Sequence, residues 1–279
     1  MAEPFYVAGE WRAAASTRDI RSPYDGSVAG THAVPEPRDL EDAVAAAVRA
    51  HQDDTPARHE RSAWLTRAAQ TVDEESERLA TIMVAESAKP LKGALAEVAR
   101  FASTLQWSAE DARRLDGEVV PLDTAAAYGP RAGLVTRVPV GPVLGITPFN
   151  YPLNLVAHKV GPALAAGCPI IVKPASATPL SALALADVFD RAGTPPGWLS
   201  VLPVDASTIQ GLVADERIAK ISFTGSPAVG WSLRQRAPRV RVTLERAIVH
   251  LAPARLRPPR GLRRANRTSR RCRRGTRRR

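Results

Sequence analysis

Two hydrophobic periods divide the chain. Between about residues 38 and 115, apolar residues recur with the period of an α-helix, as at Leu65, Ala69 and Val72. From residue 138 onward, short apolar runs alternate with helical segments. The strands expected from these runs are 140–146, 169–172, 198–204, 218–223 and 241–244, and the expected helices include 153–166 and 207–214. Short strands alternating with helices indicate right-handed crossovers between parallel strands. The sequence therefore predicts an α/β fold with a doubly wound parallel sheet.

Two dipeptides predict where further helices begin. In both Thr178-Pro179 and Ser226-Pro227, a hydroxyl side chain precedes a proline. The hydroxyl can accept a hydrogen bond from an amide of the first turn, and proline suits the first helical position. We expect Thr178 and Ser226 to cap these helices.

Charge is distributed unevenly along the 279 residues. The chain has 39 Lys+Arg and 28 Asp+Glu, but residues 246–279 hold 14 Arg and no acid. Residues 1–245 therefore carry a net charge of −3, and the basic excess belongs to the end of the chain. That end has no sustained apolar period, so a disordered tail is expected at 246–279. The remainder is expected to be one domain, with a helical region at 1–137 and strand–helix repeats at 138–245.

The rest of the composition indicates a cytoplasmic protein. Two cysteines, Cys168 and Cys272, are too few for a disulfide framework and suit a reducing compartment. Cys168 lies between a helix and an apolar run, where it is expected to fill space. No signal peptide, membrane-spanning run or metal-ligand spacing is recognisable.

Four short segments stand where the predicted strands run out into turns or helices. They are Thr147-Pro148-Phe149-Asn150, Val172-Lys173-Pro174, Thr224-Gly225-Ser226 and Thr243-Leu244-Glu245. In a doubly wound sheet, ligands bind outside the carboxyl ends of the strands. The shared position of the four segments therefore predicts one ligand site.

Each segment has a plainer interpretation as well. The turn at Gly225 and Ser226 could hold a phosphate on free amides or could simply start a helix. Lys173 could contact a ribose hydroxyl or a phosphate, or lie in solvent. Asn150 could donate to an oxyanion or occupy an ordinary turn. Glu245 could be a general base if partly desolvated, or a strand-end carboxylate in water.

Taken in this order, the segments resemble the aldehyde dehydrogenase superfamily over about residues 4–245, together with Tyr6-Val7-Ala8-Gly9-Glu10-Trp11. The resemblance implies a Rossmann-like cofactor domain. Members oxidise aldehydes to acids through a thioester, with hydride transfer to NAD or NADP, and form oligomers. Asn150 would donate to the thiohemiacetal oxyanion, and Glu245 would be the general base.

The resemblance also implies how the cofactor is held. Lys173 would bind the adenosine ribose or its 2′-phosphate, and Gly225 with Ser226 would hold the pyrophosphate. Thr147 and Pro148 are assigned to the same cofactor site. Ser176 stands where many NAD-preferring relatives carry a glutamate, so no carboxylate repels a 2′-phosphate there. This favours NADP over NAD.

The resemblance stops after Glu245. Family members continue with Leu-Gly-Gly and a second domain that carries the nucleophilic cysteine, whereas this chain continues with Arg246-Ala247-Ile248. Cys272 lacks the surroundings of that nucleophile. We therefore expect an inactive cofactor-domain fragment, with 246–279 translated out of frame.

The alternative is a binding protein whose basic tail contacts nucleic acid through phosphates. The tail has no aromatic residues for base stacking, so only unspecific binding is expected.

Overall fold

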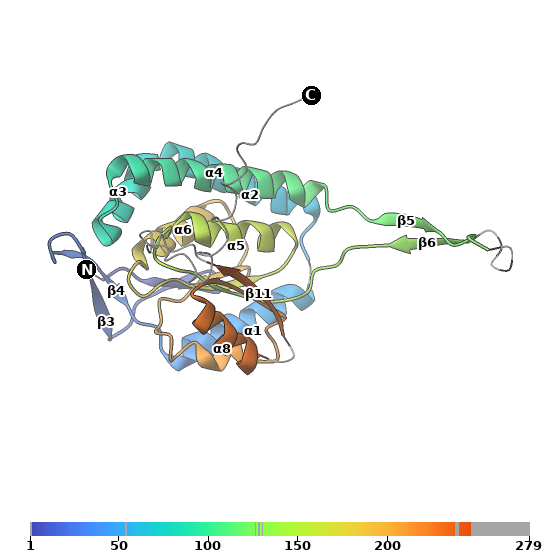
Figure 1. Cartoon of the computed structure of the whole chain (residues 1–279). Coiled ribbons are helices and arrows are strands. Elements are labelled where there is room, and N and C mark those ends of the chain that lie inside the picture. Colours follow the sequence, from blue (N-terminus) through green and yellow to red (C-terminus); the bar gives the residue numbers. More distant parts are fainter. Residues whose placement is uncertain are drawn as a thin grey trace, which may run out of the picture. The chain divides into compact units, whose positions relative to one another are not determined.

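A seven-stranded sheet runs through the centre of the structure (Figure 1). The computed structural model describes residues 2–246, except 54, 126, 128, 130, 238 and 239. In spatial order the strands are β11 (Arg241–Arg246), β10 (Lys220–Gly225), β7 (Val143–Ile146), β8 (Ile170–Lys173), β9 (Leu199–Val201), β1 (Phe5–Val7) and β2 (Glu10–Arg12). The first five are mutually parallel, whereas β1 pairs antiparallel with both β9 and β2. The predicted parallel α/β sheet is confirmed, with an antiparallel ribbon added at one edge.

Helices cover both faces of this sheet (Figure 1). Their bounds are α1 (Pro37–Asp53), α2 (Arg58–Glu74), α3 (Ser76–Ser87), α4 (Leu91–Arg113), α5 (Asn154–Ala165), α6 (Leu180–Arg191), α7 (Gln210–Val213) and α8 (Pro227–Arg236). Helices α5 and α6 lie on one face with α2 and α4 outside them, and α1 and α8 lie on the other. Strands β7, β8 and β9 are consequently buried along their whole length, which explains their continuous apolar sequences.

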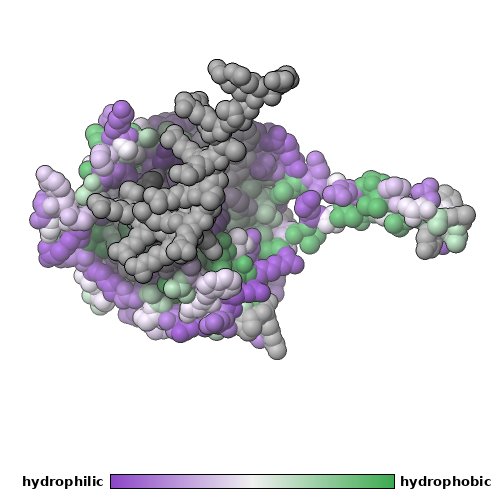
Figure 2. Space-filling model, viewed as in Figure 1, coloured by the Kyte–Doolittle hydropathy of each residue, from purple (hydrophilic) through white to green (hydrophobic). Residues whose placement is uncertain are grey.

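Two antiparallel pairs lie outside the main sheet and were not predicted. Strand β3 (Thr17–Arg21) pairs with β4 (Val28–Ala33), and β5 (Glu118–Pro121) pairs with β6 (Ala132–Val135). The β5–β6 ribbon projects away from the helices and carries exposed apolar side chains, seen as green in Figure 2. Val119 and Leu134 on this ribbon are 72% and 75% exposed. Apolar side chains on a ribbon without a covering layer indicate a contact surface.

The predicted elements are present with shifted boundaries. The helix expected at 207–214 is only the single turn α7, and the strand expected at 198–204 ends at Val201. Leu202 still donates its amide to Val172, but Pro203 has no N–H with which to continue the ladder. No described helix has both the length and the apolar composition needed to cross a membrane. The predictions for the tail beyond Arg246 lie outside the described residues.

The predicted cap at Thr178 is wrong. Helix α6 begins at Leu180, and the buried Thr178 hydroxyl has no hydrogen-bond partner among the described residues. The carboxylate of Glu86, on α3, instead accepts the amides of Leu180 (2.8 Å) and Ser181 (3.0 Å). A buried acceptor from a distant helix therefore replaces the local hydroxyl, which a local sequence pattern cannot reveal.

Candidate functional site

The carboxyl ends of the parallel strands lie side by side, as the sequence predicted. Ile146 at the end of β7 is in register with Lys173 on β8 and with Phe223 on β10. Thr147 donates its amide to the Lys173 carbonyl over 3.2 Å. Thr224 on β10 pairs with Glu245 on β11. The sheet therefore brings all four predicted segments to one edge.

A cavity of about 230 Å³ opens between β10, β11 and the start of α8. Gly225, Ser226 and Glu245 line it, with Trp231 beside them. Ser226 occupies the N-cap position as predicted, but its hydroxyl makes no capping hydrogen bond. A Cβ on Gly225 would lie 2.4 Å from the Phe223 ring, so a side chain there would force this ring to move. The uncapped first turn of α8 leaves amides and the positive end of the helix dipole available to an anion.

A second cavity, of about 220 Å³, lies between α7 and α8. Apolar side chains including Ile209, Val229 and Leu233 form its walls, and Lys173 lies at the strand ends below them. Lys173 is only 6% exposed, and burial lowers its pKa. Its Nζ donates to Ser176 Oγ at 3.4 Å, a weak contact. A buried ammonium with so few partners is costly unless a ligand supplies acceptors.

Glu245 belongs to a hydrogen-bonded chain that continues into the protein. Thr224 Oγ1 donates to Glu245 Oε2 over 2.8 Å, and Lys159 Nζ donates to that same Thr224 oxygen over 2.7 Å. Lys159 also donates to Ser222 over 3.1 Å and lies 3.7 Å from the Glu245 carboxylate. Its side chain is fully buried, and that burial lowers its pKa to about 8. Glu245 itself is 46% exposed, so water still reaches the carboxylate.

The loop that carries Asn150 is held from below by a buried ion pair. Glu97, on α4, accepts the amides of Leu153 and Asn154, each over 3.1 Å, and pairs with Lys89. Lys89 Nζ in turn donates to the Asn150 carbonyl over 3.0 Å. Glu97 is fully buried. The backbone of the loop is therefore clamped at both ends, which orients Asn150.

The Asn150 side chain itself has no hydrogen-bond partner among the described residues, although its Oδ1 is buried. The orphaned atom is a hydrogen-bond acceptor, so a bound ligand would complete it by supplying a donor. The neighbouring Tyr151 ring lies 4.4 Å from Lys89 Nζ and 5.5 Å from the Arg100 guanidinium carbon. Positive charge therefore surrounds the residue next to Asn150.

The structure brings the predicted residues together in three groups. Gly225, Ser226 and Glu245 line one cavity, and Lys173 lines the other, with Ser176 in contact with its ammonium. Thr147, Pro148 and Asn150 form the intervening loop after β7 and line neither cavity. The structure thus has two adjoining cavities along one strand-end edge, where the sequence predicted a single ligand site.

Lys159 and Glu97 were missed by the sequence reasoning. Each is a charge on an otherwise apolar helix face. Glu97 lies beside Val98 on the face that buries Phe101, and Lys159 lies next to Val160 in a helix with almost no other charge. A charged residue inside an apolar stripe is the signal that could have identified both.

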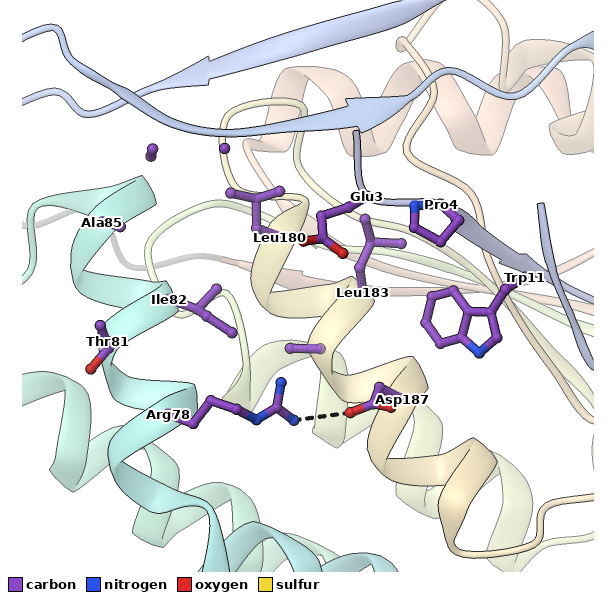
Figure 3. A pocket seen from close by; sticks show the side chains of 13 residues that line it. Glu3, Pro4, Trp11, Arg78, Thr81, Ile82, Ala85, Leu180, Leu183 and Asp187 are labelled. Atoms are coloured by element: carbon purple, nitrogen blue, oxygen red, sulfur yellow. Dashed lines mark hydrogen bonds and ion pairs between the residues drawn. The ribbon is translucent and has the colours of Figure 1, made fainter. Parts of the chain in front are cut away.

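A larger cavity, of about 550 Å³, lies away from these residues (Figure 3). It is formed between α3 and α6, and none of the predicted site residues lines it. Its arginine, Arg78, is paired with Asp187 over 3.0 Å across the opening. Because its walls are largely apolar and this ion pair is already satisfied, size alone does not make it the site. The described residues hold no cluster of three metal-ligating side chains.

Comparison with known proteins agrees with this geometry. Residues 11–247 match the model of the aldehyde dehydrogenase family. The chain is 41% identical over 241 residues to a 3-sulfolactaldehyde dehydrogenase from Priestia aryabhattai, covering 86% of this chain and 50% of that relative.

Two solved structures are similar as well. Aldehyde dehydrogenase 21 from Physcomitrella patens, in complex with its reaction product succinate, has a TM-score of 0.85 at 36% identity, over 88% of this chain and 52% of that one. NADP-dependent glyceraldehyde-3-phosphate dehydrogenase from Bacillus halodurans, complexed with NADP, has a TM-score of 0.84 at 32% identity, over 88% and 53%.

The chain thus spans about half the length of the curated relatives it matches. The match includes every segment at the carboxyl edge of the sheet, from the loop after β7 to the end of β11. With the sheet order, the glycine turn and the sequence match in agreement, the chain belongs to the aldehyde dehydrogenase family.

Proposed function

We propose that the described residues form the dinucleotide-binding part of an NAD(P)-dependent aldehyde dehydrogenase. The observation that carries this proposal is the buried, under-satisfied Lys173 at the same edge of the sheet as the uncapped start of α8. The two features lie beside cavities that share α8 as a wall. A dinucleotide has a pyrophosphate for the helix start and a ribose hydroxyl or phosphate for the lysine.

The cavity between α7 and α8 suits the adenosine end of the cofactor. Its apolar walls at Ile209 and Val229 can enclose a planar base, and Lys173 lies where the ribose would be. Ser176 next to that lysine offers a hydroxyl and no negative charge. This combination favours NADP, since a carboxylate at that position would repel a 2′-phosphate.

The residues near the β7 and β11 ends are suited to the chemistry on the aldehyde. The cofactor, when bound, accepts the hydride. Asn150 would donate its side-chain Nδ2 to the developing oxyanion, because this nitrogen donates to no described residue and Lys89 holds the Asn150 backbone carbonyl. Glu245 would take up a proton at its Oε2, and the chain through Thr224 to Lys159 would orient that oxygen.

The nucleophile is not supplied by the described residues. Cys168, the free cysteine among them, is buried and lies in the turn between α5 and β8, at the opposite end of β8 from Lys173. We propose that this chain alone binds a dinucleotide but does not turn over aldehydes.

Aldehydes with a second, acidic group are the proposed substrate class of the complete site. Of the relatives described above, one is named for 3-sulfolactaldehyde and another is in complex with succinate. In this chain Arg100 is exposed, has no ion pair among the described residues, and lies over the Tyr151 ring next to Asn150. An exposed guanidinium there could bind a distal carboxylate or sulfonate.

Calorimetric titration of the whole chain with NADP and NAD tests the proposal. Binding of either dinucleotide with one-to-one stoichiometry in 150 mM KCl is expected, with NADP the tighter ligand. Absence of binding by both would refute the assignment. For the substrate class, NMR titration with succinate should show weaker binding by Arg100→Gln, while binding of propionate, which has one carboxylate, stays the same.

A further inference from the structure

Arg236 is a cation that the strand-end pattern does not identify. It is the last residue of α8, two turns beyond Val229, and it lines the same 220 Å³ cavity as Lys173. Its Nη1 donates to the side-chain oxygen of Gln210 on α7, so the guanidinium bridges the two helices that wall the cavity. Two cations from different elements thus converge on one small space.

Neither cation is neutralised by a carboxylate. No acidic residue lines this cavity, and in the described part of the chain Arg236 makes no ion pair. Asp205, the acid whose charge reaches Lys173, is already engaged by Arg18 through bonds of 2.7 and 2.8 Å. Arg217, by contrast, is paired with Glu41. The lining of this cavity therefore carries unneutralised positive charge.

We propose that Arg236 acts with Lys173 to bind the 2′-phosphate of NADP, and so determines the preference between the two dinucleotides. This inference rests on the proposed function, because it assigns a role inside the adenosine cavity. A guanidinium has five donors, and Gln210 uses one of them, which leaves the rest for phosphate oxygens. The hydroxyl of NAD at the same position carries no charge to attract it.

The chemistry of the two cations supports a division of roles. Lys173 is buried at the strand end and can serve a hydroxyl or a phosphate as a point charge. Arg236 is exposed apart from its bond to Gln210 and offers a planar fork that fits two phosphate oxygens. Removing the arginine should therefore weaken the binding of the ligand that has a 2′-phosphate and leave the binding of the ligand without one unchanged.

The test compares 2′,5′-ADP with 5′-AMP, which differ only in the 2′-phosphate. Both are titrated calorimetrically into the whole chain, into Arg236→Gln, and into Arg234→Gln, a matched control on the same helix outside the cavity. Arg236→Gln is expected to lower the affinity for 2′,5′-ADP about ten- to hundredfold, the loss typical of a hydrogen bond to a charged group. Its affinity for 5′-AMP should change less than about twofold. Arg234→Gln should change neither affinity, which controls for the loss of one positive charge from α8.

Each other outcome decides between the two proposals. If the unaltered chain binds both nucleotides and Arg236→Gln weakens them equally or not at all, the inference is wrong and the dinucleotide site stands. If the unaltered chain binds neither, both proposals fail. Should Arg236→Gln unfold, judged by thermal melting, Arg236→Lys replaces it: it keeps the charge without the fork and should lose part of the 2′,5′-ADP affinity, and unchanged affinity for both would contradict the inference.

Discussion

The two buried lysines at the carboxyl edge of the sheet have different surroundings. Lys159, beneath Glu245, contacts Ser222 and Thr224 and lies 3.7 Å from a carboxylate. Lys173, on β8 and three strands from Glu245 in the sheet, has one hydroxyl at 3.4 Å. Burial lowers the pKa of both. Lys159 is suited to position a neighbour, because fixed hydrogen bonds hold its ammonium, and Lys173 is suited to receive a ligand, because its ammonium has donors left over.

The largest change in stability is expected where a buried ion pair is broken, at Glu97 and Lys89. Glu97→Ala should lower the free energy of unfolding by about 3–5 kcal/mol, since it leaves Lys89 without its carboxylate and two loop amides without an acceptor. Urea denaturation measures this. The double variant Lys89→Met with Glu97→Leu should cost less than the single change, because no unpaired charge remains. A loss below about 1 kcal/mol for Glu97→Ala would show that the clamp is not a tight one.

Lys173 is the buried lysine with few partners. Lys173→Met is expected to weaken the binding of NADP about hundredfold, a loss consistent with a buried charge-assisted contact. The melting temperature should stay the same or rise, because an apolar side chain replaces a desolvated cation of similar length. Calorimetry and thermal melting measure the two effects. Lys220→Met, at the other end of β10, is the control and should not alter affinity. A large fall in stability for Lys173→Met would mean that the lysine is structural.

The pH dependence of stability should separate Lys159 from an exposed lysine. Its folded pKa of about 8 lies below the unfolded value of 10.5, so the unfolded chain binds more protons between these pH values. The free energy of unfolding should therefore gain on the order of 2–3 kcal/mol from this group as pH rises from 8 to 10.5, and gain nothing below pH 8. Denaturation of Lys159→Met should lack this contribution, whereas Lys92→Met, an exposed change on α4, should keep it. Identical pH profiles for all three proteins would contradict the assignment.

The smallest effect on stability is expected at Ser226. Its hydroxyl makes no capping bond, so Ser226→Ala should cost only a few tenths of a kcal/mol rather than the roughly 1 kcal/mol of a lost cap. The free energy of dinucleotide binding should change by more than this loss of stability, because the hydroxyl is free to contact the pyrophosphate. Thermal melting and calorimetry on one sample give both values. A loss of roughly 1 kcal/mol in the free energy of unfolding would show instead that the hydroxyl caps the helix.

Much of the fold could be predicted because its elements are encoded locally. Continuous apolar runs such as that of β8 identified the buried parallel strands, and the dipeptide Ser226-Pro227 marked the start of α8. The cap of α6 could not be predicted, since its acceptor is Glu86, which lies 94 residues before Leu180 in the chain. The β5–β6 ribbon was missed because its exposed valines lack the polar alternation of a half-buried strand.

The candidate site divides in the same way. Residues that directly follow a strand, among them Asn150, Lys173 and Glu245, were predictable because the ends of parallel strands meet at one edge. Lys159 and Glu97 act from helices that pack under that edge, and Arg236 reaches it from the far end of α8. Their roles depend on which helix faces cross in space.

By itself the sequence determined the family, the alternation of parallel strands with helices after residue 138, and the side chains at the strand ends, because all of these follow from residue type and neighbouring residues. The tertiary structure alone decided which charges are satisfied. Whether a buried lysine positions a carboxylate or awaits a ligand depends on acceptors that arrive from distant segments, and the free energy of burying a charge depends on those acceptors.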